Sequence, residues 1–295
     1  MQSCARSQLI RLALALFCLC SGAQAETTLK FSGAMRWELD APWFGGWSGI
    51  EVRDQGTRMT IVSDRGELVD AVLQRSGGQL TGIGVQSRTG LKNAKGVRLD
   101  KRVGDAEGLA IGADGTPYLS FEHRHRIMQV DLSTGRTGGR IDLPFKDMLG
   151  DNAGVEALAI GPDGTLFALP EKAPDAGKPF PLYAYQNGDW RIAARIPQRG
   201  PFVPVGADLD PSGRLWLLER AATPLGFRSR VRMFVLDPAN AREYTLMTSF
   251  PARFDNLEGI SVWQDAQGQL HVTMISDDNF FRIQRTQIVE FTVVE

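Results

Sequence analysis

The sequence predicts an all-β protein folded as a closed β-propeller, from a repeated phrase, its even spacing and the turn inside each copy. The phrase is an acidic residue, an apolar segment, a tight turn, and a second apolar segment ending in another acid. It reads EGLAIGADGTPYLSFE from Glu107 and EALAIGPDGTLFALPE from Glu156. Looser copies start at Ser48, Val205 and Glu258, so the intervals are 59, 49, 49 and 53 residues. A period of this length, made of short strands, is typical of propeller blades.

Each copy predicts a hairpin of two antiparallel strands. A turn-forming dipeptide separates the two apolar runs at Gln55-Gly56, Asp114-Gly115, Asp163-Gly164, Ser212-Gly213 and Gln267-Gly268. Large and small residues alternate in the first run, as in Leu109 and Ile111 against Gly108 and Ala110. Both faces are therefore apolar or small, which indicates an inner strand packed between two neighbouring sheets.

Further strands complete the blades. The segments Ile127 to Leu132 and Gly138 to Leu143 fit a third and a fourth strand, and so do Arg230 to Leu236 and Tyr244 to Phe250. The last copy offers only three strands, and we expect Leu29 to Leu39 to supply its fourth and close the ring. The count is five blades; the alternative is a sixth, irregular blade inside the wider first interval.

The N-terminal segment predicts export. Residues 1–25 carry Arg6 and Arg11, then an apolar run, and end in Ala23-Gln24-Ala25, the pattern of a secretory signal cleaved after Ala25. This leaves one domain over residues 26–295, without a membrane-spanning segment, in the periplasm or outside the cell. All three cysteines, Cys4, Cys18 and Cys20, lie within the signal, so the mature chain has no thiol chemistry.

The charge balance and the motifs absent from the sequence argue against several partners and enzyme classes. Removing the signal changes the formal net charge from −1 to −3, because two arginines leave and no acid does. This balance does not favour binding to nucleic acid. The sequence has no G-x-S-x-G, P-loop or H-E-x-x-H motif, the usual signs of serine hydrolases, nucleotide triphosphatases and zinc proteases.

Antiparallel pairing places many acids on one rim of the ring. The start of each first strand and the end of each second strand lie at the same edge of the sheet. This rim gathers Glu107, Glu156, Glu258, Asp64, Glu122, Glu171, Glu219 and Asp277. Its connecting loops are also the long ones, such as Lys92 to Asp105 and Lys172 to Pro181, whereas the opposite turns are short. We therefore expect the functional site at this rim.

The oxygen-rich residues on the rim predict a Ca²⁺ site. Carboxylates cannot all stay ionised close together unless a cation or hydrogen-bond donors offset their repulsion, and oxygen ligands suit Ca²⁺. The expected ligands are Glu107, Glu156, Glu258, Asn152, Asn256 and Asp208, although the alignment of turns puts Val205 in the acidic position of the fourth copy. The alternative is that these acids cap backbone N–H groups or pair with arginine, and so join neighbouring blades.

Two similar phrases, SDRG from Ser63 and SDDNF from Ser276, supply candidate catalytic residues. Closure of the ring would bring Asp64 and Asp277 together as a base or as further ligands, unless both only form turns. Arg228 and Arg285 are candidates for binding an anionic substrate group.

The other polar residues are given structural roles. We expect Arg228, Arg230 and Arg232 to form a solvated strand face and His271 to be a strand residue. His123 and His125 alternate in FEHRHR, and we expect them in a solvated loop; the alternative is that both point into the mouth of the ring as a general base.

The order of motifs resembles one known family. SGI, SDRG, AEGLAI, SFE, VEALAI with PDG, GAD, LLER, DNLEGISV and ISDDNF follow one another as in the bacterial phytase-like domain, also called esterase-like activity of phytase, from Trp47 to Glu295. This resemblance implies an exported β-propeller hydrolase of phosphate or carboxylate esters. Its fourth copy departs from the pattern, with Val205 where the others have a glutamate. The copies are more distantly similar to calcium-dependent lactonase propellers, whose metal is held by acids and amides.

These observations lead to two hypotheses. The first is a hydrolase of small ester or phosphoester substrates, assisted by a divalent cation. The second is a non-catalytic propeller that binds a peptide, a glycan or an envelope partner through exposed rim aromatics such as Trp43, Trp47, Phe180 and Phe280.

Overall fold

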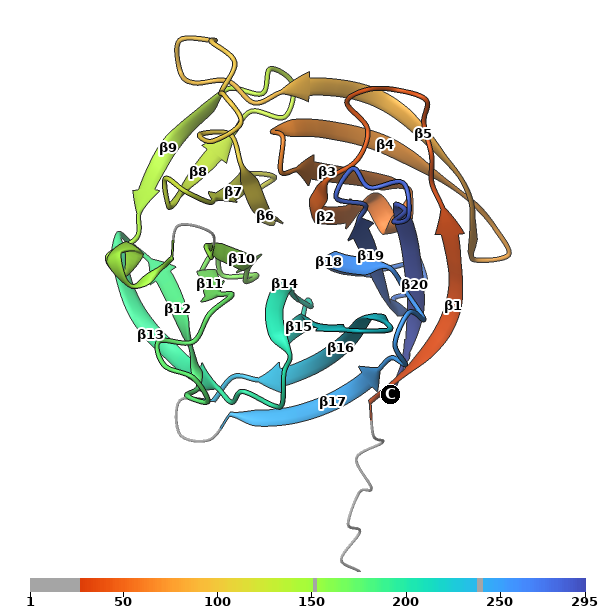
Figure 1. Ribbon diagram of the computed structural model, residues 1–295. Coiled ribbons are helices and arrows are strands. Elements are labelled where there is room, and N and C mark those ends of the chain that lie inside the picture. Colours follow the sequence, from red (N-terminus) through yellow and green to blue (C-terminus); the bar gives the residue numbers. More distant parts are fainter. Residues whose placement is uncertain (1–26, 151–152, 238–240) are drawn as a thin grey trace, which may run out of the picture.

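The computed structural model describes residues 27–150, 153–237 and 241–295, and the expected signal peptide and Asn152 lie outside them. Within these ranges, twenty strands form five four-stranded antiparallel sheets with no α-helix. Figure 1 shows the sheets as blades around a central axis, with the first strand of each blade innermost. The predicted five-bladed propeller is confirmed, and the first interval contains no sixth blade.

The first three blades follow the chain in order. Blade 1 consists of β2 (Trp47–Arg53), β3 (Arg58–Ser63), β4 (Glu67–Ser76) and β5 (Gln79–Gly90). Blade 2 consists of β6 (Ala106–Ile111), β7 (Pro117–Phe121), β8 (Arg126–Val130) and β9 (Thr137–Asp142). Blade 3 consists of β10 (Val155–Ile160), β11 (Leu166–Pro170), β12 (Phe180–Gln186) and β13 (Asp189–Ile196). Two 3₁₀ turns, η1 (Asp54–Gly56) and η2 (Lys146–Met148), lie between strands.

The last two blades complete the ring. Blade 4 consists of β14 (Val203–Leu209), β15 (Leu215–Thr223), β16 (Gly226–Val235) and β17 (Arg242–Thr248). Blade 5 consists of β18 (Asn256–Gln264), β19 (Leu270–Asp277), β20 (Gln287–Val294) and, as its outer strand, β1 (Thr28–Arg36). β1 pairs with β20 from Thr28 opposite Val294 to Arg36 opposite Gln287, so the expected closure by the N-terminal segment is confirmed.

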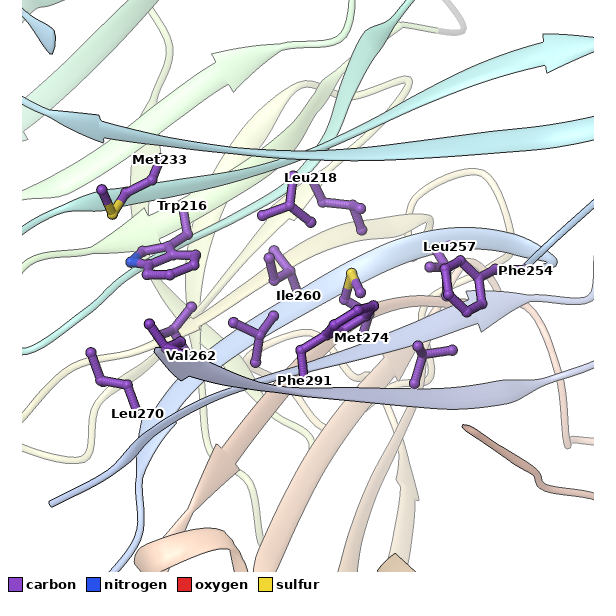
Figure 2. Packing of buried hydrophobic residues seen from close by; sticks show 14 of the residues in the cluster. Trp216, Leu218, Met233, Phe254, Leu257, Ile260, Val262, Leu270, Met274 and Phe291 are labelled. Atoms are coloured by element: carbon purple, nitrogen blue, oxygen red, sulfur yellow. The ribbon is translucent and has the colours of Figure 1, made fainter. Parts of the chain in front are cut away.

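Hydrophobic residues pack between adjacent blades. In the cluster of Figure 2, Trp216 and Leu218 from blade 4 face Ile260, Met274 and Phe291 from blade 5. All five are 5% exposed or less. Since such faces cannot be left in water, each blade is stabilised by its neighbours.

The inner strands approach one another closely around the axis. A side chain at Gly108 would have its Cβ 2.9 Å from the carbonyl oxygen of Glu156 in the next blade, and at Gly206 it would clash with the carbonyl oxygen of Glu258. This crowding explains why a small residue follows the first position of every copy. A small cavity remains between the inner strands, and residues such as Gly49, Gly108 and Gly206 line it.

Candidate functional site

Every blade has a β-bulge near the start of its inner strand. The register shifts between Trp47 and Gly49 in blade 1, and at equivalent places in the other four blades. The residues within the shifts include Ser48, Glu107, Glu156, Val205 and Glu258. A bulge changes the direction of a side chain and is common beside functional sites. The electrostatic interactions among Glu107, Glu156 and Glu258 indicate that these three side chains face a common region.

A second set of equivalent residues lies where the second strands reach this rim. The backbone N–H groups of Asp64, Glu122 and Glu171 donate to carbonyl oxygens of residues just before the inner strands, at 2.9, 3.0 and 3.1 Å. Arg220 and Asp277 occupy the corresponding places in blades 4 and 5. Four blades therefore contribute an acid at this position and blade 4 contributes an arginine.

Arg220 neutralises one side of this rim. Its guanidinium donates to Glu258, and also to Asn256 Oδ1 at 2.9 Å, and it lies 3.5 Å from Glu171 Oε1. Its charge also lowers the pKa of Glu156, although burial is the larger effect and raises it overall. Glu258, Glu156 and Asn256, three of the expected metal ligands, therefore lie around a guanidinium, as the blade-joining alternative supposes.

On the other side of the rim, the described residues form no ion pair between an arginine and Asp105 or Glu122, and the buried Arg126 donates to the carbonyl oxygens of Val103 and Arg124 instead. His123 Nε2 lies 3.2 Å from Asp105 Oδ2 and 3.7 Å from Glu122 Oε2. In the part of the chain that the structure describes, these residues are the group of three whose potential ligand atoms all lie within 4.8 Å of one another. Glu107 forms a side-chain hydrogen bond with Asp105. Among the expected ligands that the structure describes, Glu107 is thus the one that directly contacts this group.

Two further acids border this group. Asp64 and Asp277, from adjacent blades, interact electrostatically, as expected from the closure of the ring. Gly46 links the two phrases, because its carbonyl oxygen accepts the N–H of Asp64 at 2.9 Å and its own N–H donates to Asp278 Oδ1 at 3.1 Å. Asn279 and Phe280, just after Asp278, have positive φ angles of 47° and 53°, a strained backbone of the kind found at functional sites.

Crowding raises the pKa values of these carboxyls. Burial and the negative charge of Asp105 raise the pKa of Asp64 to about 6 and that of Glu122 to about 7. Burial and the charge of Glu258 raise the pKa of Asp277 to about 8. Asp64 Oδ1 is also buried without a hydrogen-bond partner. Unsatisfied, mutually repelling oxygens are the environment that a bound cation would stabilise.

The donor set fits a divalent cation. Asp105 and Glu122 offer carboxylate oxygens and His123 offers an imidazole nitrogen, and Glu107 stands next to Asp105. Carboxylates suit Ca²⁺ and Mn²⁺, and the imidazole extends the choice to Zn²⁺.

Asp208 lies apart from this group. Both of its oxygens accept backbone N–H groups, from Leu209 at 2.7 Å and from Val262 in blade 5 at 2.6 Å. It also interacts with Ser261 and with Glu51, farther along the inner strands. Its hydrogen bonds therefore join blades.

The two arginines expected to bind an anion have other contacts. Arg228 Nε donates to the carbonyl oxygen of Ser249 at 3.1 Å, and its guanidinium lies over the ring of Phe202. Arg285 lies on the β19–β20 loop, and its Nε is 3.8 Å from Asp255 Oδ2, just before β18. The structure thus gives both a role in holding loops.

Two expectations for polar residues are wrong. Arg232 is fully buried and Arg230 is 7% exposed, so the arginine-rich strand is not a solvated face. Glu219, also fully buried, accepts from Arg230 Nε at 2.6 Å and from Arg232 Nε at 2.8 Å, and this pairing makes the burial of charge tolerable. His123 is not simply in a solvated loop, since its side chain is 21% exposed and contacts Asp105. His271 is a strand residue, as expected, and stacks on Trp263.

Sequence reasoning did not single out Asp105, Glu122, His123 and Arg220 as the centre of the site. Glu122 and Arg220 carry a signal, because each occupies the position at the rim end of the second strand where the other blades have Asp64, Glu171 and Asp277. Asp105 and His123 fall outside the repeat, in loops whose path the sequence does not show.

Among the aromatics expected on the rim, Trp47 and Phe180 are at most 1% exposed and belong to the core.

Among the described residues, no helix is long and apolar enough to cross a membrane.

Several solved structures are similar to this chain, and one of them has a TM-score above 0.5. The PQQ-bound aldose sugar dehydrogenase from Streptomyces coelicolor has a TM-score of 0.52 at 13% identity, over 92% of this chain and 99% of that one. At this identity the likeness concerns the fold alone. Regucalcin, a calcium-binding protein from Agrobacterium tumefaciens, has a TM-score of 0.48 at 11% identity, over 90% and 96%. A gluconolactonase from Xanthomonas campestris has 0.44 at 16%, over 83% and 72%.

The comparisons by sequence give one family. No curated protein matches the sequence. The family model described as "Phytase-like: Esterase-like activity of phytase" matches residues 42–280, which span blades 1 to 4, the strands β18 and β19 of blade 5, and both phrases, SDRG and SDDNF. The chain therefore belongs to the phytase-like family.

Proposed function

We propose that this protein is an exported hydrolase of carboxylate or phosphate esters, assisted by a divalent cation that Asp105, Glu122 and His123 hold. The observation that carries the proposal is the grouping of these three residues on the side of the rim that Arg220 does not neutralise. Membership of the phytase-like family supports an ester substrate.

The expected cation is Ca²⁺; the alternatives are Mn²⁺, which carboxylates also suit, and Zn²⁺, which the imidazole of His123 introduces. A cation bound here would polarise the ester or phosphoryl oxygen and lower the pKa of a bound water. Glu107, hydrogen-bonded to Asp105, would orient that ligand, as residues behind metal ligands commonly do.

Asp64 and Asp277 supply the proton transfers in this proposal. With a pKa of about 6, Asp64 is mainly ionised at pH 7 and can accept a proton from the attacking water. In the metal-free protein the pKa of Asp277 is about 8, higher than that of Asp64, so Asp277 is the better candidate for the acid that donates to the leaving group. Two carboxyls whose environments separate their pKa values in this way are suited to act as base and acid.

Metal analysis of the purified protein, combined with an ester and phosphoester screen, tests the proposal. We expect hydrolysis that chelator abolishes and that Ca²⁺, Zn²⁺ or Mn²⁺ restores. Asp64→Asn should lower kcat by about 10² to 10⁴, whereas Asp142→Asn, which removes an exposed acid from β9, should not. A protein without bound metal, and without activity on any ester after metal addition, would contradict the proposal.

One observation favours the binding-module alternative. Leu225, Phe250, Phe281 and Ile283 are between 64% and 94% exposed, and all lie on loops of the same rim in blades 4 and 5. A peptide or glycan partner would contact these side chains. Loss of partner binding in Phe250→Ser and Phe281→Ser, without catalysis in the parent protein, would support this alternative.

Export rests on residues 1–25. Expression of the full chain in a bacterium, followed by N-terminal sequencing of the periplasmic and medium fractions, should give a mature chain starting at Glu26. A protein retained in the cytoplasm with its first residues intact would contradict export.

A further inference from the structure

Exposed apolar side chains gather on one part of the rim. They lie at the tip of the β15–β16 hairpin and on the β17–β18 and β19–β20 loops, and they are Leu225, Phe250, Phe281 and Ile283. Their exposed fractions are 75%, 83%, 64% and 94%, the four highest among the large apolar residues that the structure describes. Because side chains of this kind are mostly buried, a group of exposed ones marks an interaction surface.

Hydrogen bonds join these three loops to one another. They belong to blades 4 and 5, which are neighbours in the ring (Figure 1). On the β17–β18 loop, the N–H of Ala252 donates to the carbonyl oxygen of Phe227, beside the β15–β16 turn, at 2.9 Å. On the same loop, Asp255 Oδ2 accepts the N–H of Arg285, on the β19–β20 loop, at 3.1 Å. The four apolar residues therefore belong to one continuous surface, which we call the apolar patch.

Arginines surround the apolar patch. Each lies within three residues of one of its members, and they are Arg228, Arg253, Arg282 and Arg285. The side chains of Arg253 and Arg282 are exposed, and across the described ranges neither forms an ion pair with a carboxylate. Their charges are therefore available to a ligand of opposite charge.

The acids of these loops are turned to other partners. The segments 224–228, 249–255 and 278–286 contain two aspartates against the four arginines. Asp255 accepts the N–H of Arg285 and, at 2.9 Å, that of Asn256. Asp278 accepts the N–H of Gly46 at 3.1 Å and the hydroxyl of Thr286 at 3.2 Å. The surface around the apolar patch is thus positive, although the whole chain has a formal net charge of −1.

We propose that the apolar patch docks the protein on an anionic lipid bilayer. The four apolar side chains would enter the boundary between headgroups and acyl chains, where burial of apolar surface stabilises a bound protein. The arginines would stay at the level of the headgroups and contact lipid phosphates. This interaction does not depend on the proposed hydrolase function, but it would turn the rim that carries the candidate site toward the bilayer.

The arrangement favours a bilayer over the peptide or glycan of the binding-module alternative. A protein partner binds tightly where side chains fill well-packed pockets, whereas these side chains are at least 64% exposed and come from three separate loops. A fluid bilayer accepts side chains that protrude separately, because it needs no complementary shape. The arginines beside them also match the negative potential of a bilayer that contains anionic lipids.

Flotation of the purified protein with lipid vesicles tests the proposal and needs no catalysis. One kind of vesicle contains phosphatidylethanolamine and the anionic phosphatidylglycerol, and the other contains phosphatidylcholine alone. The apolar variant carries Phe250→Ser, Phe281→Ser and Ile283→Ser. The arginine variant carries Arg253→Gln and Arg282→Gln.

The controls remove the same kinds of exposed side chain elsewhere. One carries Val97→Ser, Met148→Ser and Ile192→Ser, in the β5–β6 loop, in η2 and in β13. The other carries Arg191→Gln and Arg195→Gln on β13. Because all these side chains are exposed, we expect thermal melts of the variants and controls to match the parent, so that weaker flotation reports binding and not unfolding.

We expect the parent to float with the anionic vesicles and far less with phosphatidylcholine. The apolar variant should bind the anionic vesicles more weakly by about tenfold for each side chain removed. The arginine variant should lose about fivefold per arginine at low ionic strength and less at high ionic strength. Both controls should float like the parent.

Two results would overturn the proposal directly: a parent that floats with neither kind of vesicle, and an apolar variant that floats as well as the parent. A third result would do the same. If the parent ignores vesicles but binds a peptide or a glycan through Phe250 and Phe281, the apolar patch serves the other class of partner.

Discussion

Asp208 Oδ2 accepts the backbone N–H of Val262 at 2.6 Å, and so joins blade 4 to blade 5. The equivalent residue in blade 5, Ser261, accepts the N–H of Val52 in blade 1 at 2.9 Å. In blade 1, Glu51 accepts the N–H of Ile111 in blade 2 at 3.1 Å. The remaining two blades have Ala110 and Ala159 at this position, without a side-chain acceptor. Three of the five blade junctions thus contain an equivalent hydrogen bond. In each, the acceptor side chain lies three residues after the first position of the repeated phrase.

This arrangement makes stability depend on pH. Burial raises the pKa of Asp208 to about 7, and burial and the charge of Asp208 raise that of Glu51. The unfolded chain releases these protons near pH 4, whereas the folded chain retains them, so the free energy of unfolding falls as pH rises from about 4 to about 7. Glu51→Gln keeps an acceptor for Ile111 and removes one acid. We expect the variant to match the parent at pH 4 and to melt a few degrees higher at pH 8.

Melting curves across this pH range check the prediction, with Glu38→Gln, an exposed acid, as the control. The same difference between variant and parent at pH 4 and at pH 8 would show that the two acids titrate normally.

Removal of the cation should destabilise the fold. A cation at one hundred times its Kd stabilises the folded state by about 2.7 kcal/mol, so chelator should lower the Tm of the parent. Asp105→Asn removes a ligand charge and should reduce this effect, whereas Asp142→Asn should preserve it. Differential scanning calorimetry with and without chelator measures the change. A Tm that chelator leaves unchanged argues against a cation at Asp105, Glu122 and His123.

Loss of Glu219 should be costly. Its carboxylate is the buried acceptor for both Arg230 and Arg232, and Glu219→Ala would leave two buried guanidiniums without it. The expected loss is about 3 to 5 kcal/mol in the free energy of unfolding, measured by urea denaturation. Glu243→Ala serves as the comparison, because Glu243 is 19% exposed and water can replace part of its contact with Arg232. Equal losses in the two variants would mean that burial does not set the cost.

A glycine-to-alanine substitution, which adds one methyl group, tests how closely the inner strands must pack. Gly206→Ala would press a Cβ against the carbonyl oxygen of Glu258 and separate blades 4 and 5, at a cost of about 1 to 3 kcal/mol. Gly138→Ala is the matched control, because nothing lies within 4 Å of its added Cβ. Thermal melts of both variants give the difference. A Gly206→Ala protein as stable as the control would show that the inner strands move apart easily.

The fold could be predicted because it is written in local patterns that recur. The turn dipeptides, the alternation in the inner strands and the missing fourth strand of blade 5 are each visible over a few residues. The site was harder, because it depends on side chains outside the repeat. Asp105 ends a long loop and His123 lies in a turn with a φ of 54°, and neither loop path follows from residue pattern. The prediction for the strand with Arg228, Arg230 and Arg232 was wrong for a related reason. Charged residues at every second position fit a buried face with ion pairs as well as a solvated face.

The pairing of β1 with β20 determines when folding can finish. Blade 5 takes one strand from the start of the chain and three from its end, so the ring cannot close until the whole sequence is present. Until then, the face of blade 4 that holds Trp216 and Leu218 has no partner, and its apolar side chains stay in water. If the chain crosses a membrane from its N-terminus, β1 emerges first and stays unpaired until β20 has emerged. Closure of the ring therefore removes from water apolar faces that an incomplete ring would leave exposed.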